Sequence, residues 1–269
     1  MNIYRKILDS FNVAKGDRIW LSSELARLTI QLRRDGIEFD PGNLINAFQE
    51  RLGDTGTLII PNFSFEFSNH GFYDIRNTRG VTGALGNIAM QRSDFERTHH
   101  PMHSFEIWGY DQKLLTDLRN SHSFGVDSPF AYCLSHHVKQ LILGTDYVHA
   151  MTFVHYAETV CNVPYRFAKK FSGIYVDSEG KKERYTCEYA ARKLEIRPVE
   201  RFNRIGKILE DNVISRKIDL FGIDSYVIDL AKSFPVICYD ITENKCRNIY
   251  DFNIERENVF LDTTPLKDA

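Results

Sequence analysis

Short apolar segments alternate with amphipathic segments of helical period along the first 165 residues of this 269-residue chain. The alternation predicts strands buried in a sheet and helices that cover it, which is an α/β fold. The strands are expected at residues 18–21, 57–61, 105–108 and 140–143. The helices are expected at residues 3–11, 41–52 and 82–91, with further helices starting after Glu24 and at Pro129.

Residues 166–269 have a different pattern, which predicts a smaller α+β portion after a core of about residues 1–165. The expected elements are a hairpin of residues 173–176 and 183–187, helices at 201–211 and 225–232, and strands at 217–220 and 236–239. No repeat, low-complexity segment or linker interrupts the chain. We therefore expect residues 1–269 to form a single domain.

The composition excludes several classes of protein. The chain has 34 basic and 36 acidic residues, so it lacks the basic excess of a nucleic-acid-binding protein. Its five cysteines are odd in number and widely spaced, which indicates reduced thiols and a cytoplasmic location. No apolar run is long enough to span a bilayer, and no secretory signal is recognisable. We expect neither a nucleic-acid partner nor a membrane partner.

The strongest candidate for chemistry is the pair His155 and Glu158, which follows the expected strand at 140–143. A spacing of three residues places both side chains on one face of a helix, where they can touch. An imidazole backed by a carboxylate is suited to general-base catalysis. Active sites of α/β proteins also gather beyond the carboxyl ends of strands. The alternative is a structural helix histidine beside a surface glutamate.

Three histidines, His99, His100 and His103, lie close together in the segment 98–104. They suggest a metal site, but Pro101 interrupts any helix that would align them, and no accepted zinc-binding spacing accompanies them. We expect a bend whose imidazoles make hydrogen bonds, and no metal.

Two segments have the composition of anion cradles. Ser22-Ser23 and Thr82-Gly83-Ala84 each place small or hydroxylated residues at an expected helix start, where free backbone N–H groups favour phosphate. Taken alone, ordinary helix capping is the better explanation for both segments.

An aromatic stretch follows the expected strand at 57–61. Phe63, Phe65 and Phe67 alternate with polar residues, which predicts a strand. The alternative is that they line a ligand groove together with nearby arginines that bind phosphates. Those arginines are Arg76, Arg79, Arg92 and Arg97.

Taken in order, these segments resemble the aminoglycoside 3-N-acetyltransferase family, also called the antibiotic N-acetyltransferase family. The matching segments are Leu21-Ser22-Ser23 with Leu25, Gly56-Thr57-Leu58 through Pro61-Asn62-Phe63, Arg76-Asn77-Thr78 leading to Thr82-Gly83-Ala84-Leu85, His100-Pro101-Met102-His103-Ser104, Phe124-Gly125 with Asp127-Ser128-Pro129-Phe130, and Leu143-Gly144 through Thr152, His155 and Glu158. The chain departs from the family pattern at Glu24 and at residues 146–149.

The resemblance implies a central mixed sheet flanked by helices and the transfer of an acyl group from acyl-coenzyme A to an amine of an amino sugar. It assigns the catalytic pair to His155 and Glu158. It assigns the coenzyme A site to Ser22, Ser23, Thr82, Gly83, Ala84, Leu85, His103 and Ser104. Acyl-coenzyme A, as acetyl-coenzyme A or with a longer acyl chain, is the expected co-substrate.

The acceptor is expected to be a nucleotide-linked amino sugar, such as a thymidine-diphosphate amino-deoxyhexose for surface polysaccharide. The net charge of −2 provides little long-range attraction for a polycation. A diphosphate and a flat base are suited instead to arginines and aromatic rings. The acceptor site is placed at Phe63, Glu66, Arg76 and Asp127.

Three alternatives remain open at this point. The first is an aminoglycoside acceptor, in an enzyme that confers antibiotic resistance. The second is a metal-dependent hydrolase that uses the 99–103 histidines with His155. The third is a non-catalytic module that binds coenzyme A or a sugar nucleotide.

Overall fold

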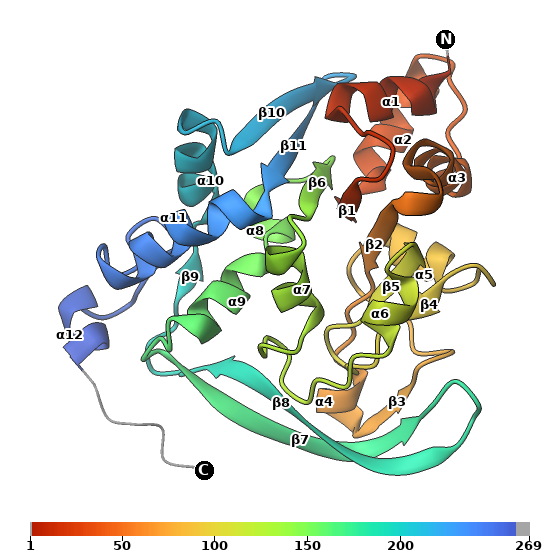
Figure 1. Cartoon of the computed structure of the whole chain (residues 1–269). Coiled ribbons are helices and arrows are strands. Elements are labelled where there is room, and N and C mark those ends of the chain that lie inside the picture. Colours follow the sequence, from red (N-terminus) through yellow and green to blue (C-terminus); the bar gives the residue numbers. More distant parts are fainter. Residues whose placement is uncertain (1, 262–269) are drawn as a thin grey trace.

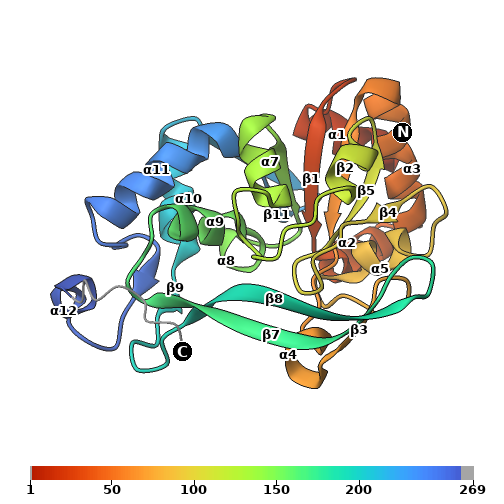
Figure 2. The ribbon, with the colours of Figure 1, turned by 60° about the horizontal axis from the view of Figure 1, so that its bottom comes forward.

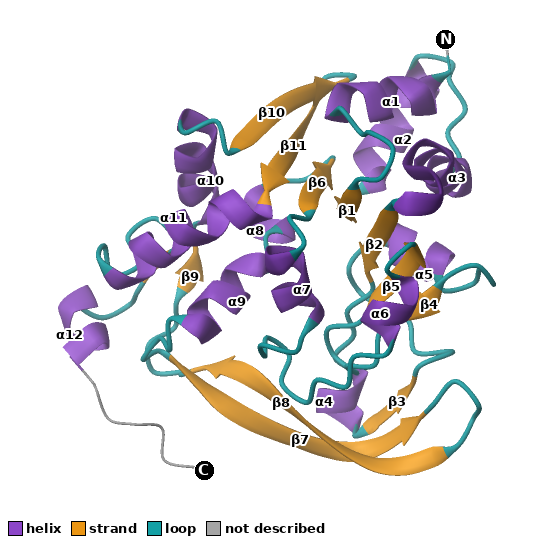
Figure 3. Cartoon of the chain, viewed as in Figure 1, coloured by secondary structure: helices purple, strands orange, loops and turns teal. Residues whose placement is uncertain are grey.

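The computed structural model describes residues 2–261 and contains a seven-stranded central sheet with helices on both faces (Figures 1 and 3). The strand order is β10-β11-β6-β1-β2-β5-β4. The strands are β1 (Arg18–Ser23), β2 (Thr57–Pro61), β3 (Phe72–Asp74), β4 (Glu96–Arg97), β5 (Phe105–Gly109), β6 (Lys139–Leu143), β7 (Arg166–Val176), β8 (Lys182–Arg192), β9 (Val199–Glu200), β10 (Ser215–Leu220), β11 (Ile223–Asp229) and β12 (Tyr250–Asp251). The predicted mixed α/β sheet is confirmed.

The helices lie between and after these strands along the chain. They are α1 (Ile3–Phe11), α2 (Leu25–Arg34), α3 (Pro41–Leu52), the 3₁₀ helix η1 (Gly53–Thr55), α4 (Glu66–His70), α5 (Ala84–Ala89), α6 (Gln112–Thr116), α7 (Pro129–Ser135), α8 (Tyr147–Ala150), α9 (Phe153–Val160), α10 (Phe202–Asp211), α11 (Leu230–Thr242) and α12 (Arg256–Leu261). Among the described residues, no helix combines the length and apolar character that crossing a bilayer requires.

The middle of the sheet is parallel and its outer strands are antiparallel. β1 pairs in parallel with β2 on one side and with β6 on the other. β5 and β11 then pair antiparallel with β2 and β6. The three parallel strands therefore end at the same edge of the sheet, where ligand sites of α/β folds lie.

Alternating side chains of the strands fill a core on each face of the sheet. Ile19 and Leu21 of β1 pack into one core with apolar residues of α1, α2, α3 and α5. Trp20, between them, packs into the other core with residues of α7, α9, α10 and α11. All three side chains are fully buried, so β1 is covered on both faces, as a central parallel strand should be.

The hairpin of β7 and β8 forms a second sheet with β3, and the hairpin runs along one side of the molecule (Figures 1 and 2). The predicted hairpin is confirmed, but its strands are 11 residues long each. Met102, Phe67, Tyr73, Tyr175 and Cys187 form a small apolar cluster against this sheet. The hairpin is anchored at its start by Arg166, which is only 3 % exposed.

The strand predicted from Phe63, Phe65 and Phe67 is wrong. The chain stays extended only as far as Ser64, whose N–H donates to the Met102 carbonyl, and then turns into α4 at Glu66. Phe63 and Phe67 are buried in two different clusters, whereas Phe65 is 40 % exposed. The alternating phenylalanines therefore do not mark a strand. They lie in a bend of the chain, and the two buried rings pack into different apolar clusters.

The predicted helix at 225–232 and strand at 236–239 are also wrong, because the boundary is shifted. β11 occupies Ile223–Asp229 between β10 and β6, and the Asp229 side chain caps α11 by accepting the N–H of Lys232. α11 then continues through Pro235. Pairing on both sides of β11 outweighs the local pattern. The division at residues 165 and 166 stays a prediction, and both β10 and β11 beyond it belong to the central sheet.

Gly144 and Gly222 provide a matched test of this packing, because their φ angles are +76° and +77°. A Cβ at Gly144 would lie 2.5 Å from the Glu24 carbonyl oxygen, whereas a Cβ at Gly222 would meet nothing within 4 Å. We expect Gly222→Ala to lower the free energy of unfolding by about 1–2 kcal/mol, the cost of a left-handed alanine. Gly144→Ala should cost about 1–3 kcal/mol more. Urea denaturation measures both, and equal losses would contradict the close approach at Gly144.

Candidate active site

A cavity of about 770 Å³ opens where the three parallel strands end. β2, β1 and β6 end at Pro61, Ser23 and Leu143, and β1 lies between the other two. Small-molecule sites usually have volumes of roughly 300–1,000 Å³, so the cavity has the size of a ligand site.

The lining comes from two groups of segments. The first group is the ends of β1 and β2, the start of α2 and the loop before α5. It contributes Trp20, Ser22, Ser23, Glu24, Arg27, Pro61, Phe63, Val81, Thr82 and Gly83. The second group is the segment after β6 with the turn between β10 and β11, and it contributes Gly144, Thr145, Asp146, His149, Ala150, Thr152, Gly222, Ile223, Asp224 and Tyr226.

His155 and Glu158 form the predicted contact on α9. Nδ1 of His155 lies 2.7 Å from Oε2 of Glu158. The His155 side chain is 13 % exposed and that of Glu158 is fully buried. His155 does not line the cavity itself. Thr152, one helical turn earlier, does line it, and the N–H of His155 donates to the Thr152 carbonyl. The backbone of His155 is therefore joined by a hydrogen bond to a residue that lines the cavity.

Glu158 is held by two further residues. Its Oε2 lies 2.7 Å from Nε of Arg166, and its Oε1 accepts a hydrogen bond of 2.8 Å from the Tyr165 hydroxyl. Burial by itself would raise the pKa of Glu158, but Arg166 and His155 outweigh it and lower that pKa to about 2. Glu158 is therefore ionised at neutral pH despite its burial.

The ionised carboxylate fixes the proton on the imidazole. Because Glu158 can only accept, the 2.7 Å contact requires a proton on Nδ1 of His155. Burial, and then the charge of Arg166, lower the pKa of His155 below its ordinary 6.5 against the opposing effect of Glu158. His155 is thus neutral at neutral pH, and no described residue forms a recorded hydrogen bond with its Nε2. This Nε2 lone pair is available to accept a proton.

The structure brings together only part of the predicted coenzyme A site. Ser22, Ser23, Thr82 and Gly83 line the cavity. Ala84 and Leu85 continue from them into α5. Thr82 does not cap α5; its hydroxyl donates to the Pro61 carbonyl and accepts the Phe63 N–H.

His103 and Ser104 lie apart from this cavity. His103 packs among aromatic rings, with Phe63 at 4.9 Å and Phe124 at 4.8 Å between ring centroids. Ser104 is fully buried and accepts a hydrogen bond from Nε of Arg97. Both residues support the core beneath the site.

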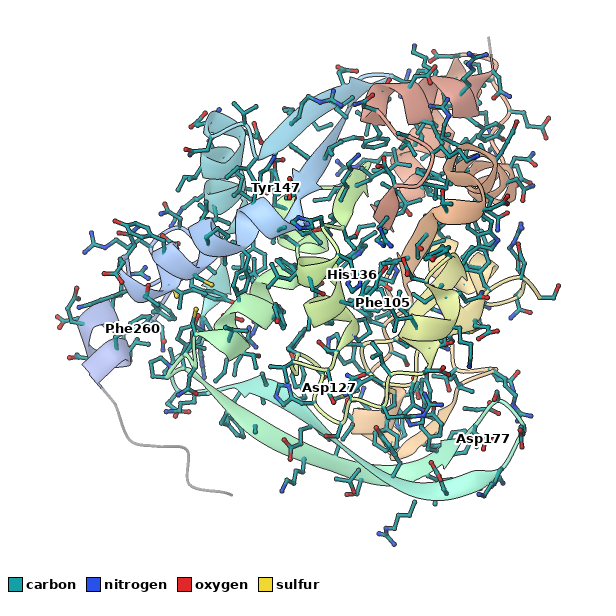
Figure 4. The ribbon with its side chains drawn as sticks, in the orientation of Figure 1. Phe105, Asp127, His136, Tyr147, Asp177 and Phe260 are labelled. Carbon is teal, nitrogen blue, oxygen red and sulfur yellow. The ribbon has the colours of Figure 1, made fainter. Side chains whose placement is uncertain are left out.

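Of the residues predicted to bind the acceptor, only Phe63 lines the cavity. Glu66 is exposed at the start of α4, 3.7 Å from His70. Arg76 pairs with Asp74 at 2.8 Å and lines a different cleft, near the turn that follows β7 at Asp177 (Figure 4). Asp127 lies in the loop before α7 (Figure 4). The structure does not gather these four residues.

The three clustered histidines also diverge. His99 packs against Tyr175 with the two rings tilted and their centroids 4.5 Å apart. Nδ1 of His100 accepts the N–H groups of Met102 and His103, which makes the predicted bend. Among residues 2–261, no three side chains of His, Cys, Asp or Glu are placed to hold a metal ion.

Sequence reasoning missed Arg166, Tyr165 and Trp20. The two partners of Glu158 follow α9 by only a few residues, but no local pattern shows that their side chains turn back toward it. Trp20 lines the cavity, and its indole Nε1 is buried without a hydrogen-bond partner. A buried unpaired donor of this kind indicates a site for a polar ligand.

The family described as aminoglycoside 3-N-acetyltransferase matches residues 33–237, which is more than half of the chain. The chain belongs to the aminoglycoside 3-N-acetyltransferase family. It is therefore an acyl-coenzyme A-dependent N-acetyltransferase, as the resemblance implied. No curated protein sequence matches it.

Solved structures of this family share its fold. Aminoglycoside acetyltransferase AAC(3)-Xa is 19 % identical, with a TM-score of 0.75 over 90 % of this chain and 92 % of that one. AAC-IIIb in a binary complex with CoASH is 18 % identical, with a TM-score of 0.74 over 90 % and 95 %. Sisomicin-bound AAC-VIa is 21 % identical, with a TM-score of 0.73 over 90 % and 97 %.

The residues present fit coenzyme A. The pantetheine arm needs a narrow channel with amide partners, and the thioester needs a hydrogen-bond donor. The cavity provides the hydroxyls of Ser23 and Thr152 and borders the unpaired Trp20 Nε1. A Cβ at Gly83 would lie 2.7 Å from the Ser23 carbonyl, so this wall tolerates only glycine there.

The lowered pKa of Glu158 has a consequence for acid stability. A carboxyl group whose folded pKa of about 2 lies below its ordinary 4.5 stabilises the fold above pH 4.5, and this stability is lost as pH falls through 2. The shift corresponds to about 3 kcal/mol. We expect the difference in unfolding free energy between wild type and Glu158→Gln to shrink by that amount between these pH values, as measured by urea denaturation.

Glu106 is the matched control, because it is also a buried glutamate beside an arginine, Arg97, at 3.3 Å. Burial raises the pKa of Glu106 in spite of Arg97 and Asn62. Its contribution is therefore present at low pH and lost as pH rises, so wild type should gain stability relative to Glu106→Gln as pH falls. The same sign for both variants would show that Arg166 does not compensate Glu158.

Proposed function

We propose that this enzyme transfers an acetyl group from acetyl-coenzyme A to an amino group of an aminoglycoside, with His155 as general base. The observation that carries the proposal is a neutral imidazole, anchored through Nδ1 and open at Nε2, one helical turn from a cavity at the carboxyl ends of β1 and β6. Family membership and the sisomicin bound in AAC-VIa support the acceptor class.

The chemistry requires a base at this position. An amine attacks a thioester only as the free base, and it must lose a proton as the amide forms. His155 takes that proton on Nε2, while Glu158 accepts the Nδ1 hydrogen bond and stabilises the imidazolium. As the C–N bond of the amide forms, the C–S bond of the thioester breaks and coenzyme A leaves as a thiolate. The imidazolium then returns its proton to this thiolate, which leaves His155 neutral again. A positioned base of this kind contributes about 10²–10⁴-fold to the rate. The remaining acceleration comes from holding the amine and the thioester together.

The first group of lining segments is assigned to acyl-coenzyme A, which supplies the acyl group as a thioester. Ser22, Ser23, Thr82 and Gly83 would hold it, since they combine hydroxyls with closely approaching backbone. Ser22 is itself oriented by Gln140, whose Nε2 donates to the Ser22 hydroxyl at 3.1 Å. Gln140 also bonds the Ala150 carbonyl, which ties this side of the cavity to α8.

The carboxylates around the cavity favour a cationic acceptor. Glu24, Asp146 and Asp224 line it, against the cations Arg27 and, when protonated, His149. Hydrogen bonds from Asn203 and His149 outweigh the partial burial of Asp146 and lower its pKa, so this carboxylate is charged at neutral pH. The cavity is therefore locally acidic and suited to amino groups, although the net charge of the whole chain is only −2. Glu24, Asp146 and Asp224 are called the acidic wall below.

The residues expected to bind a nucleotide-linked acceptor do not come together as a site. Three of the four expected arginines are engaged elsewhere: Arg76 with Asp74, Arg92 with Asp94, and buried Arg97 with Glu106. Phe63, the expected stacking ring, is only 4 % exposed and packs edge-on against Phe105. Neither a diphosphate clamp nor an open aromatic face is assembled.

His155→Ala tests the base directly. We expect kcat/KM to fall about 10²–10⁴-fold because the attacking amine no longer has a proton acceptor. The assay follows thiol release from acetyl-coenzyme A with a panel of aminoglycosides. His137→Asn is the control: His137 is exposed before β6 at a left-handed φ of 52° that asparagine accepts.

Two outcomes of that assay would overturn the proposal. Activity of His155→Ala within a few-fold of wild type would rule out His155 as the base. Thiol release by wild type with nucleotide-linked amino sugars, and with no aminoglycoside, would show that the acceptor class is wrong.

Asp224→Asn tests the acidic wall. Asp224 is 56 % exposed and pairs with Lys217 at 2.7 Å. Removing its charge should raise KM for aminoglycosides roughly two- to fivefold, the range of an exposed ion pair, and leave KM for acetyl-coenzyme A unchanged. Asp211→Asn, which removes an exposed carboxylate paired with Lys207 on α10, is the control. Equal changes in both KM values would contradict the assignment of this wall.

A further inference from the structure

Arg166, the first residue of β7, contacts both members of the pair. Its Nε lies 2.7 Å from Oε2 of Glu158, and its Nη2 lies 3.1 Å from Nδ1 of His155. Its side chain is 3 % exposed. A guanidinium this deeply buried needs a defined compensating charge, and Glu158 is the carboxylate that supplies it.

The rest of the guanidinium is fixed by neutral acceptors. Nη1 donates to the Ala190 carbonyl of β8 at 2.9 Å, and Nη2 donates to the Tyr250 hydroxyl of β12 at 3.0 Å. These bonds leave Arg166 no freedom to swing away from Glu158. The cation is therefore a permanent part of the surroundings of His155.

Arg166 also directs an Nη2–H group at Nδ1 of His155 in hydrogen-bond geometry, but its effect on the imidazole is that of a nearby positive charge. Nδ1 of His155 already donates its proton to Glu158, so Nη2 of Arg166 faces an N–H group across 3.1 Å. Two donors at this distance repel each other, and the repulsion grows when the imidazole takes up a second proton. A buried carboxylate alone would have the opposite effect, because it would draw a proton onto its imidazole partner.

We infer that Arg166 is a positioning residue that completes an Arg–Glu–His triad: it neutralises Glu158 and so keeps His155 uncharged and oriented as a base. The inference rests on the proposed role of His155. It explains how a histidine can be bound to a fully buried carboxylate and still remain a proton acceptor at neutral pH.

The other groups facing His155 do not substitute for Arg166. Phe124 and Phe202 present aromatic edges. Arg192 of β8 also lowers the pKa of His155, but by less than burial or Arg166 does. Arg192 is itself paired with Glu200. Burial holds the pKa of His103 well below its ordinary value, so that imidazole is uncharged at neutral pH. Tyr165 and Tyr250 contribute hydroxyls to Glu158 and Arg166.

Arg166→Met is the primary test, read out by NMR titration of the ¹⁵N-labelled His155 imidazole and by the pH profile of kcat/KM. We expect the imidazole pKa to rise by roughly one to three units, the effect of one charge at this distance. The acid limb of kcat/KM should rise with it. Arg166→Lys keeps the charge and should hold the imidazole pKa near that of wild type, while kcat falls because one ammonium cannot hold Glu158 and Tyr250 together.

Arg192→Met is the matched control and should shift the imidazole pKa by much less than Arg166→Met. If Arg166→Met does not fold, the comparison uses Glu158→Gln and the double variant Arg166→Met/Glu158→Gln, which leaves no buried unpaired charge. The double variant should have the higher imidazole pKa of the two.

Unchanged imidazole pKa values in Arg166→Met, or equal values in Glu158→Gln and the double variant, would overturn the inference. So would a fall in kcat with no shift of the acid limb, since that would indicate a purely structural role. These outcomes are distinct from failure of the proposed function, which shows instead as full activity in His155→Ala.

Discussion

The fully buried carboxylate of Glu158 is the interaction on which the active site depends. A charge without access to water must be compensated by partners at hydrogen-bond distance. Here three elements supply them: His155 from α9 itself, Tyr165 from the following segment and Arg166 from β7. Loss of one partner from such a group typically costs about 3–5 kcal/mol. The catalysis proposed for His155 and the docking of the β7–β8 hairpin thus depend on the same carboxylate.

The parallel pairing of β1 with β2 and β6 places the cavity. It brings Ser23, Pro61 and Leu143 to one edge of the sheet, although they are far apart in the sequence. Gly83 and Gly144 then allow the loops to approach the backbone of Ser23 and Glu24 more closely than any side chain would permit. The central sheet therefore provides a rigid frame, and the loops beyond it provide the chemistry.

The sequence was sufficient for features that depend on local periodicity. The strands at 18–21 and 57–61 and the contact of His155 with Glu158 all follow from spacing along one strand or one helix. Prediction failed where distant pairing decides. β11 is a strand because β6 and β10 pair with it on both sides. The helix through Pro235 is a different case, because its cap Asp229 is a local signal that the strand prediction at 236–239 missed.

The same limit applies to the site. Arg166 lies only eight residues beyond Glu158, but nothing local reveals that the chain reverses and returns its guanidinium to that carboxylate. The acidic wall could not be predicted for a related reason. Glu24, Asp146 and Asp224 come together only in the folded chain, and the net charge of the whole chain does not show that they do. Net charge predicts long-range steering and does not predict the lining of one cavity.

The central claim is that His155 is a neutral imidazole with its proton on Nδ1 and a free Nε2. The ¹⁵N NMR spectrum of the imidazole at neutral pH tests this claim most directly. We predict one protonated nitrogen, assigned to Nδ1 by its hydrogen bond to Glu158, and one unprotonated nitrogen, Nε2. Two protonated nitrogens, or a single proton on Nε2, would contradict the account, because His155 would then have no lone pair with which to accept the proton of the acceptor amine.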